Sequence, residues 1–158
     1  MAAAVFEAAA EDRYAGVTIT VMPGVTAAQA VAARAGAPLG GDYAVISLSD
    51  RLKPWSVIEQ RLRAIAVADL VLVVYNPASR TRREQIVRAR ELLLELRPPE
   101  TPVVVGRNVG RDGEHLTVTT LEELDAGGID MSCLLIIGSS QTRLSHSRTV
   151  WTSRSHDS

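Results

Sequence analysis

A short β-branched run that stops at a proline–glycine pair, just before a helix start, is the feature that most constrains this chain. Residues 17–21 are β-branched throughout, which is typical of a buried strand, and Pro23-Gly24 follows them. Pro has no N–H and Gly permits φ > 0, so the pair favours a tight loop. Thr26 is a candidate N-cap for a helix over 26–34, which Gly36 ends. A strand, a tight loop and a helix N-terminus with free amides predict a polar-ligand site, although an ordinary βα turn has the same pattern.

Strand-like and helix-like segments alternate along the rest of the chain. Short apolar runs predict strands, and apolar positions at i, i+3 and i+4 predict helices. The predicted strands cover 44–48, 70–75, 103–107, 116–119 and 134–137, and the predicted helices cover 2–13, 54–67, 81–96 and 121–124. A turn at 110–113 predicts a hairpin, so the predicted fold class is α/β, an α+β mixed sheet flanked by helices. The Ser-, Arg- and Thr-rich segment from Leu144 onward predicts a frayed tail.

Composition excludes several classes of protein. The net charge of −1 gives no reason to expect a nucleic-acid partner, and the longest apolar runs are far too short to span a bilayer. The single cysteine, Cys133, forms no intrachain disulfide, which fits a reducing cytosol, and its apolar surroundings indicate a core filler. The histidines are scattered without metal-ligand spacing, so we expect no metal site. These observations predict a cytoplasmic protein with neither a nucleic-acid nor a membrane partner.

Several longer segments carry a resemblance to a known family. They are PGVTAAQAVAARAGAPLGGDYAVISLSDRLKPW from Pro23 to Trp55, Tyr75-Asn76-Pro77, RPPETPVVVGRNVGRDGE from Arg97 to Glu114, and IGSSQTR at 137–143. Together they resemble the cobalamin-pathway tetrapyrrole methylases over most of the chain. The SLSD…PW and GRN-GR-GE patterns narrow the resemblance to members that methylate C17 of precorrin-3B.

The resemblance implies a function. It implies methyl transfer from S-adenosyl-L-methionine to C17 of precorrin-3B, with ring contraction to precorrin-4, by a cytoplasmic homodimer. Such a methyl donor is already activated, so the protein mainly aligns donor and acceptor and needs no metal. Two alternatives remain open: a non-catalytic folded remnant or dimerisation domain, and a methylase acting on another ring carbon. The resemblance does not distinguish a cobalt-containing substrate from a metal-free one.

The resemblance also implies a division of the chain. Family members begin with an N-terminal α/β half carrying a GxGPGD-type loop, and this sequence has no such loop. We therefore expect residues 1–15 to form a connecting helix from a missing N-terminal domain, 16–143 the C-terminal methylase domain, and 144–158 a flexible tail. A separate N-terminal methylase half is an expected partner. The Ala-rich helix at 2–10 is an expected site of self-association.

Candidate site residues follow from loops at strand ends, which form the natural rim of such a fold. By resemblance, the cofactor contacts are Pro23, Gly24, Val25, Tyr75, Asn76, Gly106, Arg107, Asn108, Gly138 and Ser139. A tetrapyrrole carries many carboxylates, and guanidinium and ammonium groups bind carboxylates, which predicts cations on the rim. The substrate-binding candidates are Arg51, Lys53, Arg80 and Arg111. Asp50 and Glu114 are candidates for acid/base work during ring contraction, and the catalytic residue itself stays unassigned.

Overall fold

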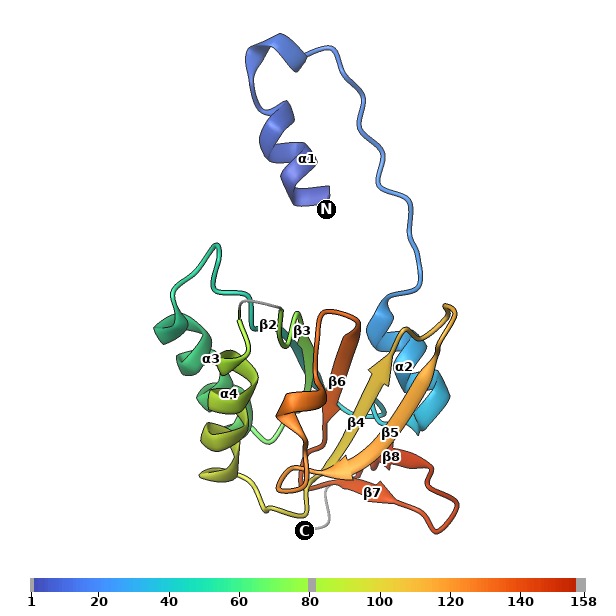
Figure 1. The fold of residues 1–158 in the computed structure, drawn as a ribbon. Coiled ribbons are helices and arrows are strands. Elements are labelled where there is room, and N and C mark those ends of the chain that lie inside the picture. The colour runs from blue at the N-terminus through green and yellow to red at the C-terminus, as the bar shows by residue number, and fades with distance from the viewer. Residues whose placement is uncertain (1, 80–81, 156–158) are drawn as a thin grey trace.

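A five-stranded mixed sheet forms the centre of the protein, and a small three-stranded sheet lies beside one end of it (Figure 1). The computed structural model describes residues 2–79 and 82–155. The helices are α1 (Ala2–Ala9), α2 (Ala27–Ala35), α3 (Trp55–Val67) and α4 (Glu84–Leu94). The strands are β1 (Gly36–Ala37), β2 (Tyr43–Ser47), β3 (Val71–Tyr75), β4 (Pro102–Arg107), β5 (His115–Thr120), β6 (Cys133–Ile137), β7 (Thr142–Leu144) and β8 (Val150–Thr152).

The large sheet has the order β2-β3-β6-β4-β5. β2 and β3 are parallel, and β6 runs antiparallel to both β3 and β4. The carboxyl ends of β2, β3 and β4 therefore lie at one edge of the sheet, together with the starts of β5 and β6. The predicted hairpin is confirmed, since β4 and β5 pair antiparallel from Arg107↔His115 to Pro102↔Thr120. The mixed sheet confirms the predicted fold class.

Helices cover both faces of this sheet. α3 and α4 pack on one face, around Ile58, Leu62 and Leu93, which have no measurable exposure. α2 covers the other face through Val31 and its alanines, which pack against β4 and β6. The predicted helix start at Thr26 is confirmed: Thr26 and Gln29 form a reciprocal capping box.

The N-terminal segment differs from its prediction. A helix over 2–13 is only partly correct, because α1 ends at Ala9 and a short 3-10 helix, Asp12–Tyr14, follows it. The strand predicted at 17–21 is wrong: this segment is extended but pairs with no strand among the described residues. Val17 and Ile19 line an apolar groove together with residues of α1, yet Val17 and Val21 stay more than half exposed. Figure 1 shows α1 and this segment leading away from the sheet.

The C-terminal part is more ordered than its sequence predicts. The frayed tail expected from Leu144 is wrong up to Thr152, because β7 and β8 form a hairpin and β8 also pairs in parallel with β1. The Thr152 hydroxyl, which is buried, lies 2.9 Å from that of Thr142 and donates to the carbonyl of Pro38. The short helix expected at 121–124 is also wrong: these residues form turns, and a 3-10 helix, Ala126–Gly128, follows, capped by Asp125.

Candidate functional site

The N-terminus of α2 is less open than the sequence predicts. The backbone N–H of Thr26 donates to Gln29 Oε1 at 2.9 Å, and that of Gln29 donates to Thr26 Oγ1. The N–H of Ala28 donates to the Tyr75 hydroxyl at 3.1 Å. Since protein groups accept from the N–H groups of Thr26, Ala28 and Gln29, the helix start offers a ligand fewer free amides than expected. Tyr75 instead fixes the start of α2 to the end of β3.

A cavity of about 270 Å³ lies between this helix start and the carboxyl ends of β3 and β4. It brings together several predicted positions, namely Tyr75, Asn76, Gly106, Asn108 and Arg111. Its remaining lining is mostly small or apolar: Ala27, Val31, Val109, Met131, Ser132, Cys133 and Leu134. These residues are not predicted from the sequence as site residues, although the predicted helix over 26–34, which directly follows the Pro23-Gly24 loop, could have indicated Ala27 and Val31.

Two asparagines shape the mouth of the cavity in the same way. Asn76 follows β3 and Asn108 follows β4, and each has φ 49°, a left-handed conformation that asparagine tolerates better than most residues. The side-chain amide of Asn76 donates to Ser47 Oγ at 2.9 Å, and the N–H of Asn108 donates to the carbonyl of Ser132. Both strands therefore turn sharply at their carboxyl ends, beside a ligand-sized space.

Gly106 gives the cavity its shape through close packing. A Cβ atom at this position would overlap Val31 Cγ2 and lie 2.9 Å from Val31 Cγ1. Val31 is buried and belongs to α2, so glycine lets this helix lie directly on β4. At Gly24, by contrast, a Cβ atom would meet nothing within 4 Å. Close packing between protein segments therefore occurs at Gly106 and not at Gly24.

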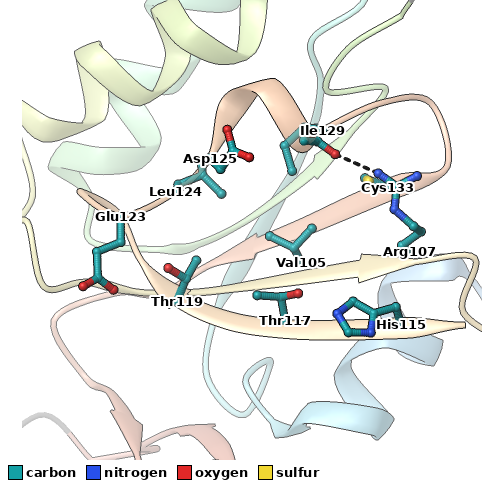
Figure 2. A pocket seen from close by; sticks show the side chains of 11 residues that line it. Val105, Arg107, His115, Thr117, Thr119, Glu123, Leu124, Asp125, Ile129 and Cys133 are labelled. Carbon is teal, nitrogen blue, oxygen red and sulfur yellow. Dashed lines mark hydrogen bonds between the residues drawn. The ribbon is translucent and has the colours of Figure 1, made fainter.

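Arg107 points away from this cavity, to the other face of the sheet. Its guanidinium donates to Asp130 Oδ2 and to the carbonyl of Gly128, both at 2.7 Å. Figure 2 shows Arg107 at one end of a second cavity of about 320 Å³, beside His115 and Cys133. The hydrogen bond from Arg107 lowers the pKa of Asp130. Arg107 therefore holds the loop before β6 in place.

Cys133 lines both cavities and is buried. Burial raises the pKa of its thiol, which favours the neutral form rather than a nucleophilic thiolate. The thiol packs with the core cluster under α3 and α4, as expected of a core filler.

Gly138 and Ser139 lie at the opposite edge of the sheet from the first cavity. β6 starts at the cavity edge with Cys133 and ends at Ile137, so residues that follow it leave from the far edge. There the carbonyl of Gly138 accepts from the buried Arg97 guanidinium, and the N–H of Ser139 donates to Thr142 Oγ1. The structure does not bring these two predicted positions together with the others.

The remaining rim candidates are dispersed. Pro23, Gly24 and Val25 lie on the exposed segment before α2 and do not line the cavity. Arg51 is exposed, and Lys53 lines a separate groove between β2 and α3. Arg80 lies outside the described residues. Of the predicted substrate cations, only Arg111 lies beside the first cavity among the residues the structure describes.

Asp50 is bound by neighbouring side chains. It accepts from Gln85 Nε2 at 2.9 Å and from Arg82 Nη1 at 3.4 Å. The bond from Gln85 is the main reason that the pKa of Asp50 is lowered. The carboxylate therefore stays ionised and anchors the loop after β2 to the start of α4, and it does not line the cavity.

Glu114 ties the β4–β5 turn to α2. Its carboxylate accepts from Arg34 Nε at 2.6 Å and from the N–H of Gly110 at 2.7 Å. The bond from Arg34, followed by that from Gly110, lowers the pKa of Glu114. Glu114 thus positions the turn that carries Asn108 and Arg111, without lining the cavity itself.

This arrangement predicts a pH-dependent turn. Because the folded pKa of Glu114 is lowered, its bonds stabilise the turn above the usual glutamate pKa of about 4.3, and this contribution is lost as the pH falls through the lowered value. We expect the protection factor of the Gly110 amide, measured by hydrogen exchange, to fall in that range. Glu114→Gln should remove most of this protection already at neutral pH. Equal protection in the variant and the parent chain at neutral pH would contradict the assignment.

Residues 2–79 and 82–155 contain no group of three or more His, Cys, Asp and Glu side chains placed to hold a metal ion. Their helices are also too short, or too polar, for any to cross a membrane.

Comparisons with known proteins agree with one another. Residues 2–125 match the family model of the Tetrapyrrole (Corrin/Porphyrin) Methylases. The chain is 59% identical over 147 residues to "Cobalamin biosynthesis protein CobIJ" of Mycobacterium tuberculosis (strain ATCC 25618 / H37Rv), covering 90% of this chain and 28% of that protein. It is 49% identical over 146 residues to "Precorrin-3B C(17)-methyltransferase" of Sinorhizobium sp, covering 91% and 58%.

A solved structure has the same fold. The "Crystal structure of the methyltransferase CobJ" superposes with a TM-score of 0.92 and 38% sequence identity, covering 97% of this chain and 64% of that one. In each of these matches the chain spans less than two thirds of the known protein.

Proposed function

This chain belongs to the tetrapyrrole methylase family, and from that premise we propose that it serves S-adenosyl-L-methionine-dependent methyl transfer to C17 of precorrin-3B, with ring contraction to precorrin-4. One observation carries the proposal. A single cavity gathers Tyr75, Asn76, Gly106 and Asn108, which are positions where the family resemblance implies cofactor contacts. The sequence identity to a named precorrin-3B C17-methyltransferase supports the same reaction.

The cavity fits part of the methyl donor. Its volume of about 270 Å³ is slightly below the roughly 300–1,000 Å³ typical of small-molecule sites, so it suits a nucleoside-sized group rather than the whole molecule. Gly106 leaves room beside the strand, and the side chains of Asn76 and Asn108 offer hydrogen-bond donors and acceptors. When bound, S-adenosyl-L-methionine supplies an activated methyl group, and the residues of this chain hold and orient it.

We propose that Arg111, the cation beside the cavity, binds the precorrin. Arg111 is exposed on the turn that Glu114 anchors, so its guanidinium is free to meet a carboxylate of the substrate. Guanidinium binds carboxylate through paired hydrogen bonds, which suits an acceptor with many acidic side chains. Arg51 lies on another exposed loop and remains a second candidate.

We further propose that this chain works in the cytoplasm as a homodimer.

The chain spans less than two thirds of the relatives described above. We propose that methyl transfer also needs the remaining part of those relatives, supplied by the same polypeptide or by another one. Residues 1–15 would then be a connecting segment to that part. The exposure of α1 supports this assignment, because residues 2–8 are exposed and Ala9 is only half-buried.

Binding of S-adenosylhomocysteine to the 158-residue chain tests the cavity. Because the cavity holds only part of the molecule, we expect binding weaker than micromolar, which nuclear magnetic resonance detects through amide shifts. The shifts should be largest at Ala27, Asn76, Gly106 and Asn108, and small at Ser139. Shifts centred on Ser139 would contradict the placement.

A matched pair of α2 variants sharpens this test. Ala27→Trp puts a large side chain at the cavity, and we expect it to abolish the shifts. Ala33→Trp changes an exposed position of the same helix that does not line the cavity, so binding should persist. If both variants bind alike, the ligand lies elsewhere.

Transfer of a labelled methyl group tests the reaction itself. The acceptors are precorrin-3B and its cobalt-containing counterpart, supplied to this chain with and without the N-terminal half of a relative. A chain that binds S-adenosylhomocysteine at the cavity, yet methylates neither acceptor under any of these conditions, would be a binding domain rather than an enzyme.

A further inference from the structure

A groove of about 240 Å³ between β2 and α3 shares no lining residue with the cavity used in the proposed function. Two cations line it, Lys53 and Arg61. Its other walls come from β2 and the second half of α3: Val45, Ile46, Ser47, Ala64 and Ile65. None of the described residues that line the groove is acidic. The groove therefore combines positive charge with apolar surface, a lining that suits an organic anion.

The charges of the groove are not neutralised by the protein. Neither Lys53 nor Arg61 forms an ion pair within residues 2–79 and 82–155. Arg63, two positions further along α3, differs from both, because its guanidinium bonds to Glu59 and Glu95. Positive charge on this helix is thus neutralised outside the groove and left without a counter-charge inside it. A bound anion would supply that counter-charge through charge-assisted hydrogen bonds, which are stronger than neutral ones.

The order of the elements places the two cations at different points along the groove. β2 and β3 are parallel, so α3, which connects them, runs back along β2. Lys53 precedes α3 and follows the carboxyl end of β2, whereas Arg61 lies in the middle of the helix. With a rise of about 1.5 Å per residue, the backbone of Arg61 lies about 9 Å along the axis from that of Trp55, where α3 begins. The two cationic side chains therefore start from separate points along an apolar wall.

The backbone of β2 adds a hydrogen-bond donor to the groove. The N–H of Leu48 donates to the carbonyl of Tyr75, at the end of β3. Backbone groups alternate in direction along a strand, so those of Ser47 point away from β3. β2 is the last strand of the sheet, and within the part of the chain that the structure describes no strand pairs with its outer side. The N–H of Ser47, which lines the groove, is therefore available to an anion.

We propose that this groove binds a short-chain dicarboxylate. One carboxylate bonds to the Lys53 ammonium and the N–H of Ser47, and the other bonds to the Arg61 guanidinium. The hydrocarbon chain between them lies against Val45 and Ile65. A volume of about 240 Å³ is below the roughly 300–1,000 Å³ typical of sites for larger ligands, which favours a molecule of this size. A ligand with a single carboxylate would leave one of the two cations without a partner.

Titration of the 158-residue chain with glutarate, followed through amide shifts by nuclear magnetic resonance, tests the site. We expect the largest shifts at Ser47 and Ala64. Glutarate should bind at least about tenfold more tightly than propionate, which has one carboxylate and so forms bonds with only one cation. Inorganic phosphate, which is too compact to reach both cations, should also bind more weakly than glutarate. If either propionate or phosphate binds as tightly as glutarate, the proposal is wrong.

Matched variants test whether the two cations hold the ligand. Lys53→Met and Arg61→Met each remove one charge and keep an apolar side chain, so each should weaken glutarate binding at least about tenfold, to the level of propionate. Arg63→Met removes the same charge from the same helix outside the groove and should leave the affinity unchanged. If Arg63→Met weakens binding as much as Arg61→Met, glutarate is attracted by the overall charge of α3, and the proposed site does not exist.

Discussion

Replacing Arg97 with methionine is expected to lower the free energy of unfolding by about 3 kcal/mol, since each buried acceptor left without its donor costs about 1–3 kcal/mol. Arg97 is only 6% exposed, and its guanidinium donates to the carbonyls of Gly138, Leu70 and Ile65. These carbonyls belong to the end of β6, the start of β3 and the end of α3. One side chain thus links α3 to the edge of the sheet where the start of β3 pairs with the end of β6.

Urea denaturation measures the effect, and another arginine provides the control. Arg143 also donates to backbone carbonyls, those of Ser140 and Thr142, but it is exposed. Water can replace its bonds, so Arg143→Met should change stability by less than about 0.5 kcal/mol. Arg97→Lys should fall between the two, because an ammonium lacks the fork that reaches several acceptors. Equal losses in Arg97→Met and Arg143→Met would show that burial of the guanidinium is unimportant.

Gly106→Ala is the second change with a large expected effect, a loss of about 2–3 kcal/mol from overpacking. The new Cβ would meet both methyl groups of Val31, whose β-branched side chain has essentially one rotamer in a helix. α2 must then move away from β4, which also changes the cavity. Urea denaturation measures the loss, and Gly24→Ala is the matched control because a Cβ at Gly24 meets nothing.

A double variant tests whether the contact with Val31 causes the loss of stability in Gly106→Ala. Val31→Ala removes the two methyl groups that the new Cβ meets, so Gly106→Ala with Val31→Ala should be more stable than the sum of the single losses predicts. Strictly additive losses would mean that overlap with Val31 is not the reason that Gly106→Ala destabilises the protein.

The sequence predicts most of the elements of the sheet because their signals are local. The buried run that forms β3, the cap at Thr26 and the turn between β4 and β5 depend on neighbouring residues alone. The strand expected at 17–21 has the right residue types, yet a strand also needs a partner, and that is not a local property.

The grouping of residues at the candidate site also depends on more than the local sequence. Asn76 and Asn108 line the same cavity because both follow strands that run in the same direction. Gly138 and Ser139 also follow a strand, but β6 is antiparallel to the others, so they leave from the far edge. The direction of a strand decides at which edge of the sheet the following loop lies. A motif of a few residues does not show that direction. The helix start has fewer free amides than expected for a related reason, because the Tyr75 hydroxyl accepts from the N–H of Ala28 across 47 positions of sequence.

The pairing of β1 with β8 has a consequence for synthesis of the protein on the ribosome. Thr152 donates to the carbonyl of Pro38 across 114 positions, and β8 aligns with β1 at Gly36↔Val150. The small sheet closes only after the last strand has left the exit tunnel, although its first strand emerges early. Contacts this distant slow folding, so a nascent chain holds β1 unpaired until β8 has been synthesised. A stop codon before Val150 would therefore leave an early strand permanently without its neighbour, far from the site of the truncation.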